Sequence, residues 1–246
     1  PSGRSPGGER PECQFFPVMR LKDVSFVSPK ENLLFDDILL HLAEQGQSGE
    51  VLRFWESPAV CVVLGRTGKP EKDLWREAID RDGVQVYRRS SGGGTVLQGP
   101  GCLNYALILD KESDPRLQDI RKSYEVILGQ VIRVLFSCGI RAEFRPVSDL
   151  VLPEKEMKFS GNAQRRGKRF ILHHGTLLYD FPLDLIQRYL QPPEDAPDYR
   201  QGRAHQEFVT NLPVSREGVK TAFIQHFAIH LTEKTLSRQE SQCLLE

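Results

Sequence analysis

The stretch KFSGNAQRRGKRFILHH, residues 158–174, continues into GTLLY and decides the fold of this chain. Two runs rich in apolar and small residues, Met157–Gln164 and Phe170–Tyr179, predict a pair of strands. The basic residues RRGKR between the two runs predict the turn that joins these strands. A further strand is expected just upstream, over Phe144–Leu152.

Working outward, short β-rich runs and apolar periodicity predict elements on both sides of this stretch. Strands are expected at Val51–Trp55, Ala59–Leu64, Val84–Arg88, Thr95–Leu97 and Leu103–Leu109, and the first two of these are expected to form a hairpin. Helices are expected from about Glu31 to Ala43, over Glu71–Arg81, from Asp114 to about Cys138, over Pro182–Leu190, and from the N-cap Ser215 to about Leu231. Strands with helices between only some of them indicate an α+β fold, a mixed, largely antiparallel sheet with packed helices.

No internal repeat and no central linker interrupts this pattern, so one domain is expected over residues 15–232. The opening PSGRSPGGERPE is polar and lacks the apolar segment of a signal peptide, and residues 1–14 are therefore expected to be a disordered leader. The polar residues 233–246 are expected to be a frayed tail.

Composition narrows the class of protein. Basic and acidic residues number 33 each, so the chain carries no net charge and nucleic acid is not an expected partner. No run of about 18 apolar residues occurs, so no membrane partner is expected. Five scattered cysteines without CxxC spacing argue against a disulfide framework or a zinc ribbon and suit a reducing compartment. We therefore expect a cytoplasmic protein, with an organelle matrix as the alternative.

Lys158 is the first candidate for chemistry. It precedes a run of small residues, which predicts a lysine on a strand with open space around it. An ammonium group there is a compact point charge that can touch two anionic groups at once. The alternative is an ordinary strand-edge lysine that deters aggregation.

The stretch RRSSGGGTVLQGPGCLNY, residues 88–105, is the second candidate. Three consecutive glycines cost conformational entropy unless the backbone must approach something closely. Strands are expected on both sides, and neither GxGxxG nor GxxxxGK[ST] is present, so this is not a dinucleotide fingerprint or a P-loop. The pattern predicts a cradle of amides for phosphate oxygens, assisted by Arg88 or Arg89. The alternative is a floppy surface loop.

The histidines and cysteines point to weaker sites. His173 and His174 have no Cys or carboxylate at ligand spacing, so one buried, hydrogen-bonded histidine is expected rather than a metal site. The segment HFAIH, residues 226–230, lacks the glutamate of HExxH. Cys102 has no neighbouring His or Lys to lower its pKa, and a small buried thiol is expected there.

In this order, the motifs resemble the lipoate–protein ligase A family and its relatives, the lipoyl- and octanoyltransferases. The resemblance covers about residues 33–227 and rests on LRFWESPAVCVVLGR (52–66), RRSSGGGTV (88–96), SDLVL (148–152), KFSGNAQRR (158–166), HHGTLL (173–178) and FVTNL (208–212). It implies a fold related to the biotin ligase and class II tRNA-synthetase core. It also implies a reaction: ATP and lipoate give lipoyl-adenylate and pyrophosphate, and a carrier-protein lysine then takes the acyl group.

The resemblance also assigns roles to residues. Lys158 would be catalytic, in contact with the lipoyl carboxyl oxygen and the α-phosphate. The ATP- or adenylate-binding positions would be Arg89, Ser91, Gly93, Gly94, Thr95, Val96, Leu97, Asp149 and Lys158. The lipoate-binding positions would be Trp55, Arg66, Arg88, Asn104, Gly161, Ala163, His174, Gly175 and Thr176. Mg²⁺ would accompany ATP, and no protein metal site is expected.

Two departures from the family leave alternatives open. The larger ligases carry a further C-terminal domain, so this chain would be a compact ligase, would need a separate accessory subunit, or would only transfer from preformed lipoyl-adenylate. Where the family often has His-Asp, this chain has Gln98-Gly99.

The rival is an ATP-independent octanoyl- or lipoyltransferase that uses an acyl-cysteine. Its cysteine would precede the SDL motif, where residues 142–148 (AEFRPVS) contain none. A non-catalytic lipoate-binding subunit would need neither Lys158 nor the three glycines.

The partners implied are lipoyl-domain or glycine-cleavage H-type carrier proteins. The sequence leaves open whether the acyl chain is lipoate, octanoate or a related acid, which carrier is modified, and the oligomeric state.

Overall fold

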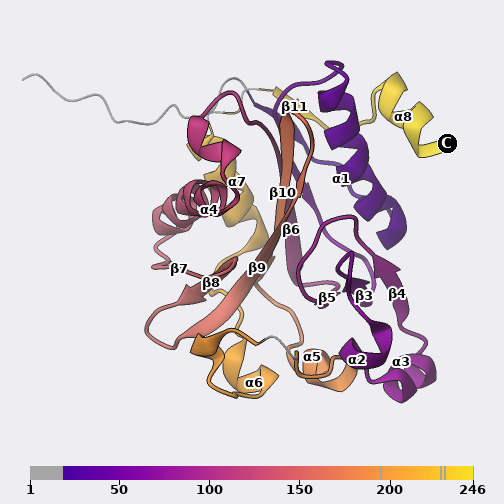
Figure 1. The fold of residues 1–246 in the computed structure, drawn as a ribbon, viewed down its shortest axis with the longest axis vertical. Coiled ribbons are helices and arrows are strands. Elements are labelled where there is room, and N and C mark those ends of the chain that lie inside the picture. Colours follow the sequence, from indigo (N-terminus) through magenta and orange to yellow (C-terminus); the bar gives the residue numbers. More distant parts are fainter. Residues whose placement is uncertain (1–18, 194–195, 228, 230, 246) are drawn as a thin grey trace, which may run out of the picture.

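A computed structural model describes residues 19–193, 196–227, 229 and 231–245 of the chain (Figure 1). The expected leader over residues 1–14 lies outside the described residues. No helix in these ranges is long and apolar enough to cross a membrane.

An eight-stranded sheet runs through the centre of the molecule in the order β11-β1-β2-β6-β10-β9-β8-β7. Pairing is antiparallel from β2 to β7, and β1 runs parallel to both β2 and β11. The strands are β1 Arg20–Lys22, β2 Val51–Trp55, β6 Cys102–Asp110, β7 Glu143–Arg145, β8 Asp149–Leu152, β9 Met157–Arg166, β10 Phe170–Leu178 and β11 Leu231–Glu233. The predicted α+β class with a largely antiparallel sheet is therefore confirmed.

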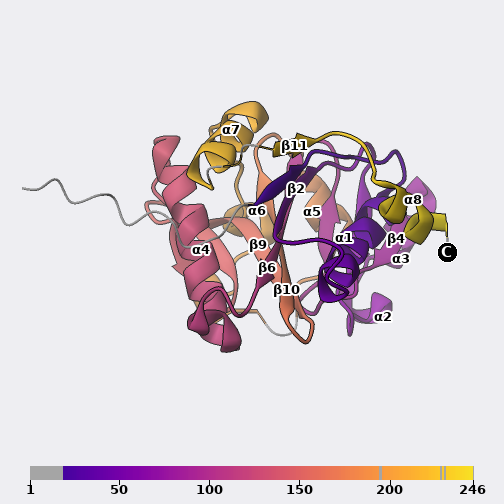
Figure 2. The same ribbon diagram turned by 90° about the horizontal axis from the view of Figure 1, so that it is seen from above.

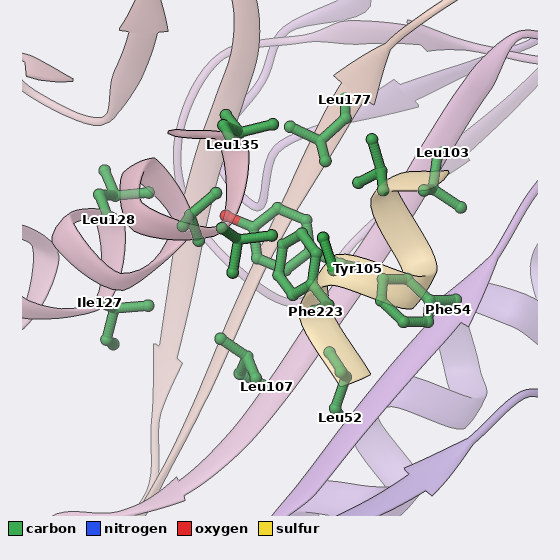
Figure 3. Packing of buried hydrophobic residues seen from close by; sticks show 14 of the residues in the cluster. Leu52, Phe54, Leu103, Tyr105, Leu107, Ile127, Leu128, Leu135, Leu177 and Phe223 are labelled. Carbon is green, nitrogen blue, oxygen red and sulfur yellow. The ribbon is translucent and has the colours of Figure 1, made fainter. Parts of the chain in front are cut away.

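Helices cover both faces of this sheet (Figure 2). On one face, α4 (Ile120–Ser137) and α7 (Arg216–His226) pack on apolar side chains of β2, β6 and β10. Figure 3 shows Tyr105 and Phe223 meeting at the centre of this core. On the other face, α1 (Pro29–Glu44) packs on side chains of the same central strands. The sheet thus has a helix layer on each side.

A second sheet of three strands, in the order β4-β3-β5, lies beside the first. Its strands are β3 Cys61–Leu64, β4 Gln85–Arg88 and β5 Val96–Gln98, and the short helices α2 Pro70–Asp73, α3 Arg76–Asp82 and α5 Asp184–Tyr189 surround it. The remaining elements are the 3₁₀ turns η1 Pro115–Gln118 and η2 Asp198–Arg200, and the helices α6 His205–Phe208 and α8 Arg238–Leu245. This small sheet carries the glycine stretch, between β4 and β5.

The predicted hairpin between β2 and β3 is wrong. β2 pairs with β1 and β6 in the large sheet, whereas β3 pairs with β4 and β5 in the small one. Both strands are completely buried, so their apolar side chains find a core in either sheet. Burial alone does not choose the partner strand.

Several predicted elements are divided in the structure. The helix expected over 71–81 becomes α2 and α3, separated where Leu74 bridges to Leu190. The helix expected from Asp114 becomes η1 and α4, because Asp119 caps a new helix by accepting a hydrogen bond from the Lys122 amide. The strand expected over 144–152 becomes the antiparallel pair β7 and β8.

In place of the frayed tail expected over 233–246, the structure shows α8 packed against α1 (Figure 1). The anchor is Lys22, whose buried Nζ lies 2.6 Å from Glu233 Oε2 and 2.7 Å from Glu240 Oε2. Two carboxylates around one buried ammonium tie the tail to β1. The predicted N-cap Ser215 is confirmed, since its hydroxyl accepts from the Gly218 amide.

Candidate functional site

Five of the predicted site residues form one row across the large sheet. Trp55 of β2 pairs with Asn104 of β6, Asn104 with Thr176 of β10, Thr176 with Gly161 of β9, and Gly161 with Asp149 of β8. Paired residues point to the same face of a sheet. The antiparallel register therefore assembles one surface from segments that are far apart in the sequence.

Lys158 joins this surface through a β-bulge. Ser160 pairs with Leu150 and Lys158 pairs with Val151, so Phe159 is one extra residue on β9. Strict alternation would place Lys158 and Gly161 on opposite faces, and the extra residue cancels that difference. A Cβ atom added to Gly161 would lie 3.1 Å from Lys158 Nζ. The missing side chain at Gly161 thus makes the space in which the ammonium lies.

Asp149 and the segment that begins with η2 hold this lysine. Lys158 Nζ lies 2.8 Å from Asp149 Oδ1, with the lysine side chain 28% exposed and the aspartate 11%. The second carboxylate oxygen, Oδ2, accepts a 2.7 Å hydrogen bond from the Tyr199 hydroxyl. The Thr210 amide donates to the Lys158 carbonyl at 2.8 Å. The ammonium is half-buried and fixed, but still accessible.

The glycine stretch lies over the same face. Ser91 Oγ and His174 Nε2 are within hydrogen-bond distance at 2.7 Å, and a Cβ on Gly93 would lie 3.9 Å from Ala163 Cβ. Ala163 and Gly161 are two residues apart on β9, which corresponds to roughly 7 Å along a strand. The structure therefore brings Lys158 and the glycine loop together, as the sequence analysis required.

Arg89 organises the loop from within. Its guanidinium donates to the carbonyls of Gly92 at 2.7 Å and Gly94 at 2.8 Å, to Val63 O at 3.3 Å and to Ser91 Oγ at 3.0 Å. Burial lowers the pKa of Arg89 to about 10, so it remains charged at neutral pH. The predicted phosphate contact of Arg89 stays a prediction, because these groups already use its donors.

Arg88 holds the neighbouring turn in the same way. Its Nη1 donates to the carbonyls of Gly65 at 2.9 Å, Arg66 at 3.1 Å and Gly68 at 2.9 Å. The Arg66 amide donates in turn to the Ser91 carbonyl at 2.8 Å, while the Arg66 side chain is exposed. A Cβ on Gly65 would collide with the Gly93 carbonyl oxygen, so only glycine lets the two turns approach.

The amides of the three consecutive glycines have no hydrogen-bond partner among the described residues. In the hydrogen bonds of the described chain, the amides of Gly92, Gly93 and Gly94 donate to no protein group. Gly92 and Gly94 have open space where a side chain would be, and Gly93 has a positive φ of 86°. The next residue, Thr95, is held by Asp73, since its hydroxyl donates to Asp73 Oδ2 at 2.5 Å. These amides can receive an anion.

Val96 and Leu97 lie just after the three glycines and anchor the C-terminal end of the loop in the small sheet. They begin β5 and pair with Val63 and Val62 of β3, and Leu97 is buried in the core of the small sheet. Their side chains stabilise the loop base.

The two adjacent histidines are both kept neutral. Burial lowers the pKa of His173 to about 3, and burial followed by the charge of Arg89 lowers the pKa of His174 to about 3. His173 is fully buried, with Gln164 Nε2 3.2 Å from its Nδ1, so the expected buried histidine is confirmed. His174 faces the site and presents an uncharged ring beside Ser91.

Two other predicted lipoate positions, Trp55 and Asn104, are buried. Trp55 is buried, and its indole donates to Asp36 Oδ2 at 3.3 Å. Asn104 Oδ1 accepts from Thr176 Oγ1 at 3.2 Å and from Gln98 Nε2 at 2.8 Å, which makes a polar floor next to Gly161.

Gly175 belongs to the opposite face. It pairs with Asn162 and Tyr105, and a Cβ there would overlap Asn162 Oδ1. The Tyr105 hydroxyl donates to this same Oδ1 at 2.5 Å, and Asn162 Nδ2 donates to the Ser148 carbonyl at 2.8 Å. The glycine thus protects a buried hydrogen-bond chain that ends next to Asp149.

Sequence reasoning missed Tyr199, Asn162, Asp73 and Gly65. Tyr199 lies in the 3₁₀ turn η2, and its partner Asp149 is 50 residues away in the sequence. Nothing local signals such a contact. Gly65 alone carried a signal, since it directly follows a buried strand.

The arginines at the end of β9 and in the turn after it bind other groups of the chain. Arg165 pairs with Asp37, Arg169 pairs with Asp110 and Glu112, and Arg166 donates to the carbonyls of Leu117 and Gln118. In the described ranges no group of three or more His, Cys, Asp or Glu residues could hold a metal.

Comparison with known proteins adds the family. The sequence model of the lipoyl protein ligase A/B catalytic domain matches residues 28–228. A probable lipoate-protein ligase A of Mycoplasma pneumoniae is 31% identical over 174 residues, which cover 69% of this chain and 49% of that protein. The chain spans about half the length of the first such relatives.

The chain is also similar to an octanoyltransferase in sequence and to a lipoate-protein ligase in structure. The octanoyltransferase LipM of Brevibacillus brevis is 25% identical and is matched over 87% of this chain and 88% of its own. A crystal structure of lipoate-protein ligase A bound with ATP shares the fold, with a TM-score of 0.77, 23% identity and 93% of each chain covered.

Proposed function

Because the chain belongs to the family of lipoyl protein ligase A/B catalytic domains, we propose that it attaches lipoate to a lysine of a lipoyl-carrier protein in an ATP-dependent reaction. The acyl group passes through lipoyl-adenylate. The observation that carries the proposal is the position of Lys158, a fixed and accessible ammonium facing a loop of free glycine amides.

The first step joins two anions. A lipoate carboxylate oxygen attacks the α-phosphorus of ATP, the P–O bond to the β-phosphate breaks, and pyrophosphate leaves. Lys158 offsets the repulsion between carboxylate and α-phosphate and stabilises the charge that develops on the phosphate. The amides of Gly92–Gly94 bind the nucleotide phosphates without any rearrangement of the loop.

The second step consumes the mixed anhydride. The amine of a carrier lysine attacks the acyl carbon, the bond to AMP breaks, and an amide forms with loss of one proton. The uncharged His174 and the polar floor of Asn104 and Thr176 line the surface on which the acyl group would lie. Magnesium enters as the counter-ion of the ATP phosphates rather than as an ion held by protein ligands.

The carrier proteins proposed are lipoyl domains or glycine-cleavage H-type proteins. A compact ligase, a ligase that needs an accessory subunit, and a transferase using preformed lipoyl-adenylate share the same site. Supplying lipoate with ATP, or lipoyl-adenylate alone, separates these cases.

The second candidate is an ATP-independent octanoyltransferase, which the similarity to LipM favours. That reaction needs a reactive cysteine near Lys158. Cys61 and Cys102 are buried, and burial raises the pKa of Cys61 to about 11 and that of Cys102 further still. Cys138 lies at the end of α4, partly buried against the core on the other face of the sheet, and Cys243 lies in α8, partly buried against the core that includes α1. These positions favour the ligase.

The test replaces Lys158 by alanine. We expect normal folding and a loss of acyl-adenylate formation by about 10² or more, since fixed groups that stabilise developing charge contribute about that factor. ATP–pyrophosphate exchange with lipoate measures the first step, and the mass of a lipoyl-domain acceptor measures the second. Lys220→Ala is the matched control, because Lys220 also pairs with an aspartate, Asp23 at 2.8 Å, on another element.

Unchanged ATP-dependent lipoylation by Lys158→Ala would refute the assignment. Transfer from octanoyl-carrier protein without ATP would identify the transferase instead.

A further inference from the structure

We propose that Tyr199 is a positioning residue of this site: its phenol fixes the Asp149 carboxylate, and through it the Lys158 ammonium, without touching substrate. The kinetic part of this inference rests on the proposed function. The geometric part does not.

The contacts of Asp149 carry the proposal. Each carboxylate oxygen has one donor, Lys158 Nζ at 2.8 Å on Oδ1 and the Tyr199 hydroxyl at 2.7 Å on Oδ2. The last torsion of an aspartate side chain is broad, so one partner alone would leave the carboxylate free to rotate. A second donor on the other oxygen fixes the plane of the group. The ammonium then has one defined position above Gly161.

The Tyr199 hydroxyl keeps its proton and therefore remains a hydrogen-bond donor. Burial, followed by the charge of Asp149 and its hydrogen bond, raises the pKa of the phenol, so it keeps its proton at neutral pH. The phenol is therefore a neutral partner that stabilises the charged carboxylate.

The segment that carries Tyr199 is itself held in place by ring and hydrogen-bond contacts. Its ring packs against Phe208 at 5.2 Å, and the Tyr199 carbonyl accepts from Arg203 Nη2 at 2.9 Å. The guanidinium groups of Arg200 and Arg203 lie 5.0 and 5.3 Å from the Phe208 ring centre. Two residues beyond Phe208, the Thr210 amide binds the Lys158 carbonyl. One segment thus fixes the lysine at both its main chain and its side chain.

The phenol has two effects, and both are expected to raise the rate of adenylation. It stops the carboxylate from rotating, which keeps Lys158 aimed at the pocket. It also shares the negative charge of Asp149, which weakens the hold of that carboxylate on the ammonium. The first effect places the ammonium beside the pocket, and the second makes it easier for the ammonium to leave Asp149 for the substrate anions. Loss of the hydroxyl should therefore slow adenylation rather than substrate binding.

The kinetic test compares Tyr199→Phe with Tyr189→Phe. Tyr189, in α5, is the matched control, because its hydroxyl also binds an aspartate, Asp82 of α3, at 3.1 Å. In Tyr199→Phe we expect kcat for lipoyl-adenylate formation to fall about tenfold, with both KM values within about twofold, since misplaced groups cost rate. Both variants should melt near the wild-type temperature. An unchanged or higher kcat for Tyr199→Phe, or an equal loss in Tyr189→Phe, overturns the proposal.

A double-mutant cycle tests whether Tyr199 acts through Asp149. In an Asp149→Asn background, adding Tyr199→Phe should change kcat by less than about twofold, because coupled residues are not additive. A full tenfold further loss in that background would mean that Tyr199 acts elsewhere, and would overturn the inference.

A third measurement is independent of catalysis. Trace labelling with acetic anhydride and mass spectrometry gives the reactivity of each lysine amine. In Tyr199→Phe the undivided charge of Asp149 should hold the Lys158 ammonium more tightly, so the labelling of Lys158 should slow about threefold, while that of Lys220 is unchanged. Unchanged or faster labelling of Lys158 contradicts the positioning role. If wild-type protein forms no adenylate, the proposed function fails while this measurement still decides the geometry.

Discussion

Replacing Gly161 by alanine tests whether activity depends on the exact position of the Lys158 ammonium, because the lysine itself is kept. The added Cβ would lie 3.1 Å from Lys158 Nζ, 3.2 Å from its Cε and 3.8 Å from Asp149 Oδ1. The first two distances are shorter than an ordinary van der Waals contact. Because the obstructed atoms are the end of a flexible side chain, the lysine rather than the backbone will move.

The size of the effect follows from the shift. A displacement of roughly 0.3–0.5 Å relieves the contact, and if 1 Å of misplacement costs about 10² in rate, this shift costs about 4- to 10-fold. Stability should change in the other direction, since alanine in a strand is favoured over glycine by about 0.5–1 kcal/mol. We expect an enzyme that is slower but no less stable.

The assay is ATP–pyrophosphate exchange in the presence of lipoate, with urea unfolding of the same preparation. Gly129→Ala is the control, because nothing lies within 4 Å of a Cβ at this position in α4. That variant should keep full activity. Wild-type activity in Gly161→Ala, or loss of its stability instead of its activity, would refute the view that the ammonium must lie where the glycine leaves room.

Two further predictions concern stability. Gly175→Ala should lower the free energy of unfolding by about 2–5 kcal/mol, because the new Cβ overlaps Asn162 Oδ1 and must break its buried bond to Tyr105; urea unfolding checks this, and a loss below about 1 kcal/mol would contradict it. Burial raises the pKa of Glu50 from 4.5 to about 7, so its protonated form favours the folded state, and this stability, present below pH 4.5, is lost as the pH rises through 7. Relative to Glu50→Gln, the wild type should therefore lose about 2.5 kcal/mol of its free energy of unfolding between pH 5 and pH 8. If the unfolding free energies of the two proteins change with pH in parallel, Glu50 is not the cause of the pH dependence.

The elements that could be predicted are those with a strong local signal. Apolar spacing indicated α1 and α4, and alternation with turn residues indicated β4, β6, β9 and β10. The association of Lys158 with the glycine loop was also expected from the motifs. Local pattern and final structure agree here because each segment buries one continuous face.

Long-range choices could not be predicted. The extra residue Phe159, which turns Lys158 toward Gly161, depends on the register against β8 rather than on any local preference. The phosphate role of Arg89 stays a prediction, whereas its hydrogen bonds to the carbonyls of Gly92 and Gly94 were not predicted, because they depend on how the loop folds back on the side chain. Tyr199 could not be found from the sequence because the bond that gives it a role forms only when distant segments meet.

The neighbouring arginines Arg88 and Arg89 have a consequence for how the pocket meets a ligand. Arg89 draws the carbonyl oxygens of Gly92 and Gly94 inward around a cation, and the peptide plane that carries the Gly92 oxygen must then point the Gly93 amide hydrogen outward. The main chain is thus polarised before any nucleotide arrives, with the entropy of ordering already lost during folding. A lysine in place of Arg89 has one nitrogen instead of a fork and could not gather these carbonyls together. The anion receptor therefore owes its shape to the half-buried Arg89 and, through the adjoining turn, to the exposed Arg88.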